Sequence, residues 1–277
     1  MLTSSNGQAK SRAQKIMHML RALAVDPVGV GRALPGEYRQ TRGTEQYAAA
    51  DVDESWDEHL HSLLHAAWPC SCRDRLDQLM WDIQTLLSSK GLAFGRGTYG
   101  WYSDADISLC QAVWCTVVHA KPAVVVETGV ARGVTSRVVL EALRLNSSGH
   151  LWSIDLPHPL DRDLHSQTGA AVTDDCRGRW TYLEGSSRRL LPRLVKDVGE
   201  VQLFIHDSLH TARNTLFEME AVSPRMNPGG VMLVDDIKSH DGFAAFAHRH
   251  RDYATSVCPS ADRISVFGLA VLPRRHS

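Results

Sequence analysis

The sequence predicts an α/β fold, in which a doubly wound, mostly parallel seven-stranded sheet follows an N-terminal helical cap. From residue 123 onward, short β-branched and apolar runs alternate with helical segments, which is typical of a parallel sheet covered on both faces. The first of these runs breaks into a glycine-rich turn that leads directly into a helix. The expected strands are 123–128, 150–154, 180–184, 201–206, 230–235, 254–258 and 264–272, and the expected helices are 133–145, 187–196, 211–222 and 241–250.

Three segments are expected along the chain: a flexible N-terminal segment over 1–50, a helical cap with an aromatic loop over 51–120, and the sheet domain over 121–277. The first 25 residues form a basic amphipathic pattern, which fits a transit peptide, a surface-docking helix, or simply a frayed helix with a solvated basic face. Within the cap, apolar spacing predicts helices over 55–68, 73–89 and 104–119. The cap helices also offer a surface for a homo-oligomer.

Composition excludes several classes of protein. The 277 residues are 43% hydrophobic and 22% charged, as in an ordinary globular protein. No apolar run approaches the roughly 18 residues of a membrane span, and a net charge of −1 argues against a nucleic-acid partner. The six cysteines form no paired framework and are typical of a reducing, cytoplasmic compartment. Cys70-Ser-Cys72 is too isolated to form a structural zinc site without other ligands.

The glycine-rich turn distinguishes between two cofactors. A turn that binds a nicotinamide dinucleotide carries its acidic residue about 20 residues beyond the glycines. Here Glu127 ends the strand itself, ahead of Gly129 and Gly133, where a carboxylate would repel phosphates and attract the cationic end of S-adenosylmethionine (SAM). Asp155, at the end of the second strand, is placed to accept hydrogen bonds from ribose hydroxyls. The alternative is that both acids are merely solvated strand ends.

With these residues the chain resembles the Rossmann-like class I SAM-dependent methyltransferases from about residue 121 to its end. Glu127, Gly129 and Gly133 match the first motif of that family, and Asp155 matches its ribose-binding acid. The resemblance places 180–187 beside adenine, and it implies that the last strand is antiparallel and follows a hairpin. The cofactor-binding residues that it implies are Glu127, Gly129, Ala131, Gly133, Thr135, Ser136, Asp155, Gly185, Ser186 and Asp207.

Three carboxylates follow neighbouring strands: Asp207 after the fourth, and Asp235 and Asp236 after the fifth. Because ligands bind at the carboxyl ends of parallel strands, these acids would repel one another unless a cation lay between them. Oxygen ligands with open positions suit Mg²⁺ or Mn²⁺. The pattern is similar to that of metal-dependent O-methyltransferases, nearest the sugar- and antibiotic-tailoring group. Alternatively, Asp235 and Asp236 only cap the next helix or meet a basic side chain.

The remaining candidates are a base and a lid. His210, three residues after Asp207, is the candidate general base; His206 is expected to be a buried hydrogen-bonding residue and His240 is the reserve. An aromatic, glycine-rich loop carries Tyr99, Trp101 and Tyr102, which either close over the acceptor substrate or pack against the cap.

These observations predict a SAM-dependent O-methyltransferase, assisted by Mg²⁺, that acts on a small hydroxylated molecule such as a sugar or natural-product intermediate. The alternatives are a metal-independent N- or O-methyltransferase and a catalytically silent SAM-binding scaffold whose N-terminal helices recruit a partner. A nicotinamide-dependent oxidoreductase is disfavoured by Glu127.

Overall fold

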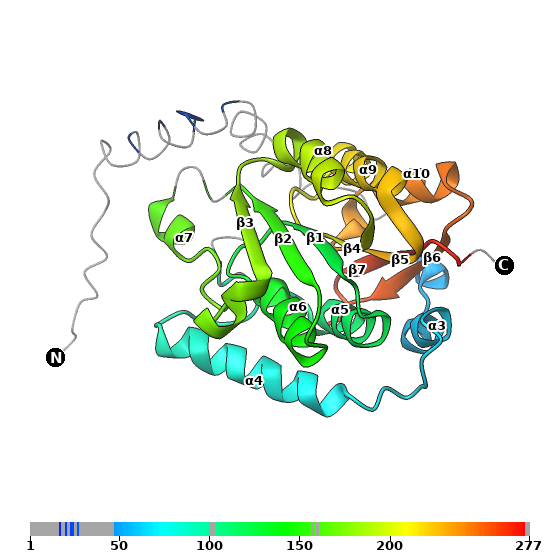
Figure 1. Cartoon of the computed structure of the whole chain (residues 1–277), viewed down its shortest axis with the longest axis horizontal. Coiled ribbons are helices and arrows are strands. Elements are labelled where there is room, and N and C mark those ends of the chain that lie inside the picture. Colours follow the sequence, from blue (N-terminus) through cyan, green and yellow to red (C-terminus); the bar gives the residue numbers. More distant parts are fainter. Residues whose placement is uncertain are drawn as a thin grey trace.

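Within the described residues, seven strands form one sheet in the order β3-β2-β1-β4-β5-β7-β6 (Figure 1). The computed structural model describes residues 47–99, 103–156, 158 and 161–274, together with Met17, Leu20, Leu23, Ala24 and Pro27. Strands β1 to β5 pair in parallel, and β7 is antiparallel to both β5 and β6, as predicted. The strands are β1 (Val124–Thr128), β2 (His150–Asp155), β3 (Trp180–Glu184), β4 (Val201–His206), β5 (Met226–Val234), β6 (Ala254–Pro259) and β7 (Val266–Val271).

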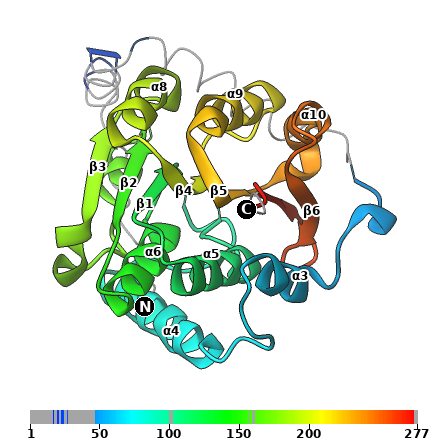
Figure 2. The same cartoon turned by 45° about the vertical axis from the view of Figure 1, so that its right-hand side comes forward.

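Helices cover both faces of the sheet (Figure 2). Because successive strand residues point to opposite faces, Leu203 and Ile205 of β4 belong to one hydrophobic cluster and Phe204 belongs to the other. The first face carries α3 (Trp56–Leu63), α4 (Arg73–Ser89), α5 (Ile107–Ala120) and α6 (Val134–Leu145). The second carries α8 (Ser187–Val198), α9 (Ala212–Val222) and α10 (Gly242–Arg249).

The helices of the predicted cap belong to the core: α5 packs on the sheet, and α4 packs on α5 and α6. Leu76, Leu79, Ile83 and Leu87 of α4 recur at helical spacing, are all buried, and share a cluster with strand residues. Burying each of these side chains contributes about 1.5 to 3 kcal/mol. The division of the chain at residues 50 and 120 stays a prediction. No helix in the described part of the chain is long and apolar enough to cross a membrane.

Local sequence sets where the central helices begin and end. The Asp106 carboxylate accepts a hydrogen bond from the Ser108 amide and caps α5, which stops at Lys121 in the left-handed conformation. Helix α6 begins at Gly133. The sequence missed α7 (Arg162–Ser166) and the 3₁₀ helix Asp174–Arg179, because both are too short for a periodic pattern.

The strand order puts a topological switch point at β1 and β4. The chain runs outward from β1 through β2 to β3, and then returns to place β4 on the other side of β1. In open parallel sheets this is where a crevice forms outside the carboxyl ends of the strands. The predicted site residues follow β1, β2, β4 and β5, so they lie at the carboxyl ends of the strands, which form one edge of the sheet.

Candidate active site

The turn after β1 needs glycine because another strand end packs against it. Gly129 has φ +85°, and its amide donates to the Ile154 carbonyl at 2.8 Å. A Cβ at Gly129 would lie 1.8 Å from the carbonyl oxygen of Asp207, while one at Gly133 would lie 3.1 Å from the Cα of Gly169. Both glycines therefore accommodate other parts of the chain, and their role in binding the cofactor stays a prediction.

Glu127 is completely buried. Its Oε2 accepts hydrogen bonds from the hydroxyls of Ser136 (2.7 Å) and Ser153 (2.6 Å), and burial raises its pKa to about 8. Its Oε1 has no hydrogen-bond partner among the described residues, and neither does the buried Oγ1 of Thr135. Buried polar atoms normally have partners, so the turn retains unused hydrogen-bonding capacity that fits a bound ligand with donor groups. Sequence reasoning did not find Ser153.

Asp155 joins the ends of β2 and β1. Its Oδ2 accepts a hydrogen bond from the Ala131 amide at 3.1 Å. Burial raises the pKa of the Asp155 carboxyl to about 6, although hydrogen bonds from backbone amides lower it. The Gly185 amide donates to the Asp155 carbonyl at 2.8 Å, which brings the predicted adenine-side turn, with Gly185 and Ser186, beside this strand end. One carboxylate oxygen of Asp155 therefore positions the glycine-rich turn.

Two aspartates and one histidine form a group at the carboxyl ends of β4 and β5. Ligand atoms of Asp207, His210 and Asp235 lie within 4.8 Å of one another, and all three side chains are partly exposed. The Asp207 amide donates to the Thr128 carbonyl (2.8 Å) and the Asp235 amide to the His206 carbonyl (2.8 Å), so backbone bonds fix both acids. Burial and the charge of Asp207 raise the pKa of Asp235 well above its ordinary value.

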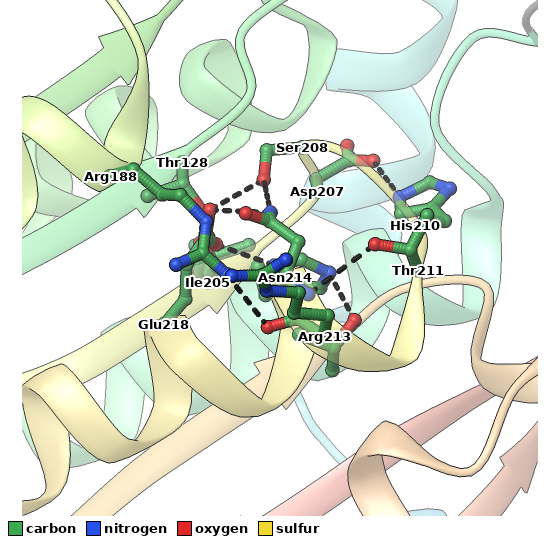
Figure 3. Close-up of polar contacts among 12 residues, drawn as sticks. Thr128, Arg188, Ile205, Asp207, Ser208, His210, Thr211, Arg213, Asn214 and Glu218 are labelled. Atoms are coloured by element: carbon green, nitrogen blue, oxygen red, sulfur yellow. Dashed lines mark hydrogen bonds and ion pairs between the residues drawn. The ribbon is translucent and has the colours of Figure 1, made fainter. Parts of the chain in front are cut away.

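Asp236 lies outside this group, although the sequence placed it there as a third metal ligand. Its backbone is left-handed (φ +47°), and its Oδ1 accepts a hydrogen bond from the Ser265 hydroxyl at 2.5 Å. Its Oδ2 lies 3.5 Å from Nδ1 of His210. On the other side of the ring, Nε2 of His210 lies 3.5 Å from Oδ1 of Asp207 (Figure 3). Burial lowers the pKa of His210, but the two carboxylates outweigh it and the net shift is upward.

A buried network supports this edge of the sheet (Figure 3). Glu218 of α9 is fully buried, and its Oε1 accepts hydrogen bonds from Ser208 (2.7 Å) and Asn214 (2.8 Å). Its Oε2 accepts one from Thr128 (2.5 Å) and lies 2.6 Å from Nδ1 of His206, confirming that His206 is a buried hydrogen-bonding residue. Burial raises the pKa of Glu218, but His206 and the donors outweigh it and bring the pKa to about 2.

Sequence reasoning missed Glu218, because nothing in a helical pattern distinguishes a buried glutamate from a solvated one. The network holds the residues on both sides of Asp207, and so fixes the loop that presents this acid. His240, the reserve base, is also buried; burial and the neighbouring histidines lower its pKa to about 4.

Arg132 fastens the aromatic loop to the glycine-rich turn. Its guanidinium donates to the backbone carbonyls of Ala93 (2.6 Å) and Thr98, and forms a buried ion pair with Asp104 at 3.4 Å. Tyr99 is buried beneath it, and its hydroxyl donates to the Leu164 carbonyl at 3.1 Å. The structure therefore supports packing, rather than lid closure, for Tyr99. Trp101, Tyr102 and most of the predicted N-terminal helix lie outside the described residues.

Comparison with known proteins agrees with this architecture. The model of a methyltransferase-domain family matches residues 126–237, which span the turn and all the strand-end acids. A comparison with curated proteins gives no match.

Solved structures share the fold. An O-methyltransferase from Klebsiella pneumoniae, described as putative, has a TM-score of 0.51 at 14% identity, covering 79% of this chain and 97% of that one. TomG, an O-methyltransferase of tomaymycin synthesis from Streptomyces achromogenes solved with SAM, has a TM-score of 0.52 at 14% identity, with 79% and 96% coverage. The methyltransferase PaMTH1 from Podospora anserina has 0.52 at 12%, with 76% and 99% coverage. At these identities the likeness establishes the fold.

The sheet order and the likeness to these structures confirm the predicted Rossmann-like fold, and the methyltransferase-domain match over residues 126–237 agrees with the predicted enzyme class.

Proposed function

We propose that the protein is an O-methyltransferase that transfers the methyl group of SAM to a hydroxyl of a small molecule, such as a sugar or natural-product intermediate, with the help of Mg²⁺ or Mn²⁺. The observation that carries the proposal is the convergence of Asp207 and Asp235 beside the cofactor turn. Two carboxylates held this close by backbone bonds favour a cation between them, and oxygen ligands suit these two metals.

Each residue of the site would have its own role in methyl transfer. SAM supplies an electrophilic methyl group on a cationic sulfur, and transfer requires mainly that the acceptor oxygen be aligned with it. On the cofactor turn, Oε1 of Glu127 and Oγ1 of Thr135 have no hydrogen-bond partner among the described residues, so they could accept hydrogen bonds from SAM. Asp155 fixes that turn through the Ala131 amide. Asp207 and Asp235 would hold the metal, which supplies a Lewis acid that lowers the pKa of the acceptor hydroxyl.

His210, the candidate general base, also lies between two carboxylates. Asp207 and Asp236 both lie 3.5 Å from its ring nitrogens and raise its pKa, so the imidazole can compensate the charge of the two carboxylates. The same observation favours a second candidate, a metal-independent methyltransferase, because His210 can supply a positive charge at the site without a metal.

One experiment separates the two candidates. Purified protein is incubated with SAM and a panel of hydroxylated acceptors, and S-adenosylhomocysteine is measured by mass spectrometry. Under the proposal EDTA abolishes turnover, and Mg²⁺ or Mn²⁺ restores it whereas Zn²⁺ does not. Full turnover in EDTA would establish the metal-independent candidate instead. Absence of SAM binding by calorimetry would refute both.

The cysteines support a location for the enzyme. None of the six forms a disulfide, as is usual in the reducing environment of the cytoplasm. We therefore propose that the protein acts there, which fractionation of the source cells would test.

A further inference from the structure

A cluster of cysteine and histidine side chains lies near the amino-terminal end of β1, whereas the candidate active site lies at the carboxyl ends of the strands. It forms where α3 and the loop after it meet the C-terminal half of α5. Helix α5 leads into the start of β1, whereas the cofactor turn follows the end of β1. The members of the cluster are His61, Cys70, Cys72, Cys115 and His119.

The distances within the cluster are close to those between ligands of one tetrahedral ion. Sγ of Cys70 lies 3.2 Å from Sγ of Cys72 and 3.4 Å from Nε2 of His119, and Cys72 lies 3.9 Å from the same nitrogen. Around Zn²⁺, with sulfur at about 2.3 Å and nitrogen at about 2.0 to 2.1 Å, tetrahedral geometry separates ligand atoms by about 3.3 to 3.8 Å. Ligand atoms of His61, Cys70 and His119 lie within 4.8 Å of one another.

His61 provides an independent indication of a ligand. The side chain is completely buried, and its Nδ1 lies 2.7 Å from the carbonyl oxygen of Asp57. Because a carbonyl can only accept, Nδ1 carries the proton and Nε2 of the neutral ring offers a lone pair. This Nε2 is buried without a hydrogen-bond partner in the part of the chain that the structure describes. A metal-binding histidine is commonly oriented in this way, by a carbonyl on its other nitrogen.

Cys70 lies at the centre of the cluster, because its Sγ contacts Sγ of Cys72, Sγ of Cys115 and Nε2 of His119. A cysteine ligates a metal as the thiolate. Sulfur and imidazole ligands together select Zn²⁺ rather than Mg²⁺.

We propose that His61, Cys70, Cys72 and His119 bind a structural Zn²⁺ ion. Cys72 is chosen as the fourth ligand because its Sγ lies within 4 Å of both Cys70 and His119, whereas Cys115 lies 3.4 Å from Cys70 and within 4.8 Å of a ligand atom of His61. Four protein ligands close the coordination sphere, as in structural rather than catalytic zinc sites. The ion would fasten the loop before α4 to α3 and α5. From sequence alone Cys70 and Cys72 lacked further ligands; the fold supplies two histidines.

The test is the metal content of the full-length protein, purified without chelators and under reducing conditions. We expect about one zinc per chain by mass spectrometry. Cys70→Ser, Cys72→Ser and His61→Ala should each lose the zinc and lower the melting temperature. Cys110→Ser is the matched control, because this buried cysteine lies on α5 outside the cluster, and it should keep the zinc. Cys115→Ser should keep it too.

A second measurement avoids dependence on the folding of variants. Wild-type apoprotein titrated with Co²⁺ should develop thiolate-to-cobalt absorption and tetrahedral d–d bands, which equimolar Zn²⁺ removes. The proposal is overturned if wild-type protein binds neither metal, or if Cys70→Ser retains a full equivalent of zinc. Retention by Cys72→Ser together with loss by Cys115→Ser would overturn the assignment of the fourth ligand.

Discussion

Replacing Gly129 by alanine should disturb the position of Asp207, because the two residues touch through their backbones. An added Cβ would lie 1.8 Å from the Asp207 carbonyl oxygen and 2.3 Å from its carbonyl carbon. These are backbone atoms of a paired strand end, so they cannot rotate away as a flexible side chain would. The turn and the β4 loop would have to separate.

The loss in unfolding free energy caused by Gly129→Ala has two parts. The left-handed backbone of Gly129 (φ +85°) penalises alanine by about 1 to 2 kcal/mol. Overpacking adds about 1 to 3 kcal/mol, giving a total near 3 kcal/mol. For a chain of this size that lowers the melting temperature by about 10 °C. A shift of Asp207 by about 1 Å should reduce turnover by about 10²-fold.

Gly91→Ala is the matched control for Gly129→Ala. Gly91 has φ +71°, and an added Cβ there would meet no described atom within 4 Å, so this variant carries the conformational cost alone. Both variants are compared with wild type by thermal melting, SAM calorimetry and turnover. If Gly129→Ala melts and turns over like Gly91→Ala, the steric coupling between the cofactor turn and Asp207 is refuted.

Three further predictions concern acids around the candidate site. Asp155→Asn should weaken SAM binding by about 1.5 to 3 kcal/mol, as calorimetry would show, because a charge-assisted hydrogen bond is lost; unchanged affinity would contradict this. Asp235→Asn should melt at or above the wild-type temperature, since it removes a carboxylate that burial and Asp207 disfavour, and should nevertheless lose at least about 100-fold in turnover. Glu218, with its pKa lowered to about 2, should contribute about 3 kcal/mol of stability above pH 4.5, which is lost as the pH falls toward 2. In Glu218→Gln the unfolding free energy should therefore depend less on pH between 4.5 and 2, and an unaltered acid titration of stability would count against the network.

The strands and helices around the site could be predicted from sequence because their signals are local. Runs such as Val124 to Val126 and the helical spacing of α4 are set by neighbours along the chain, and helix α4 begins and ends where predicted. The acids Asp155, Asp207 and Asp235 could be assigned to one edge because parallel strands bring their carboxyl ends together.

Tertiary structure decided which groups meet. Glu218 lies 90 residues from Thr128 in sequence yet hydrogen bonds to it, and its helix carries no mark of that role. Likewise, Arg132 fastens the aromatic loop through contacts that no local pattern encodes.

By itself, then, the sequence determined the alternation of strands and helices, and it predicted the family and the edge of the sheet where the candidate site lies. The fold alone decided that Asp235 and Asp236 have different partners and that Cys70 lies against His119, 49 residues away. The reason is physical: periodicity and turn chemistry act over a few residues, whereas side-chain contacts depend on how whole helices pack against the sheet.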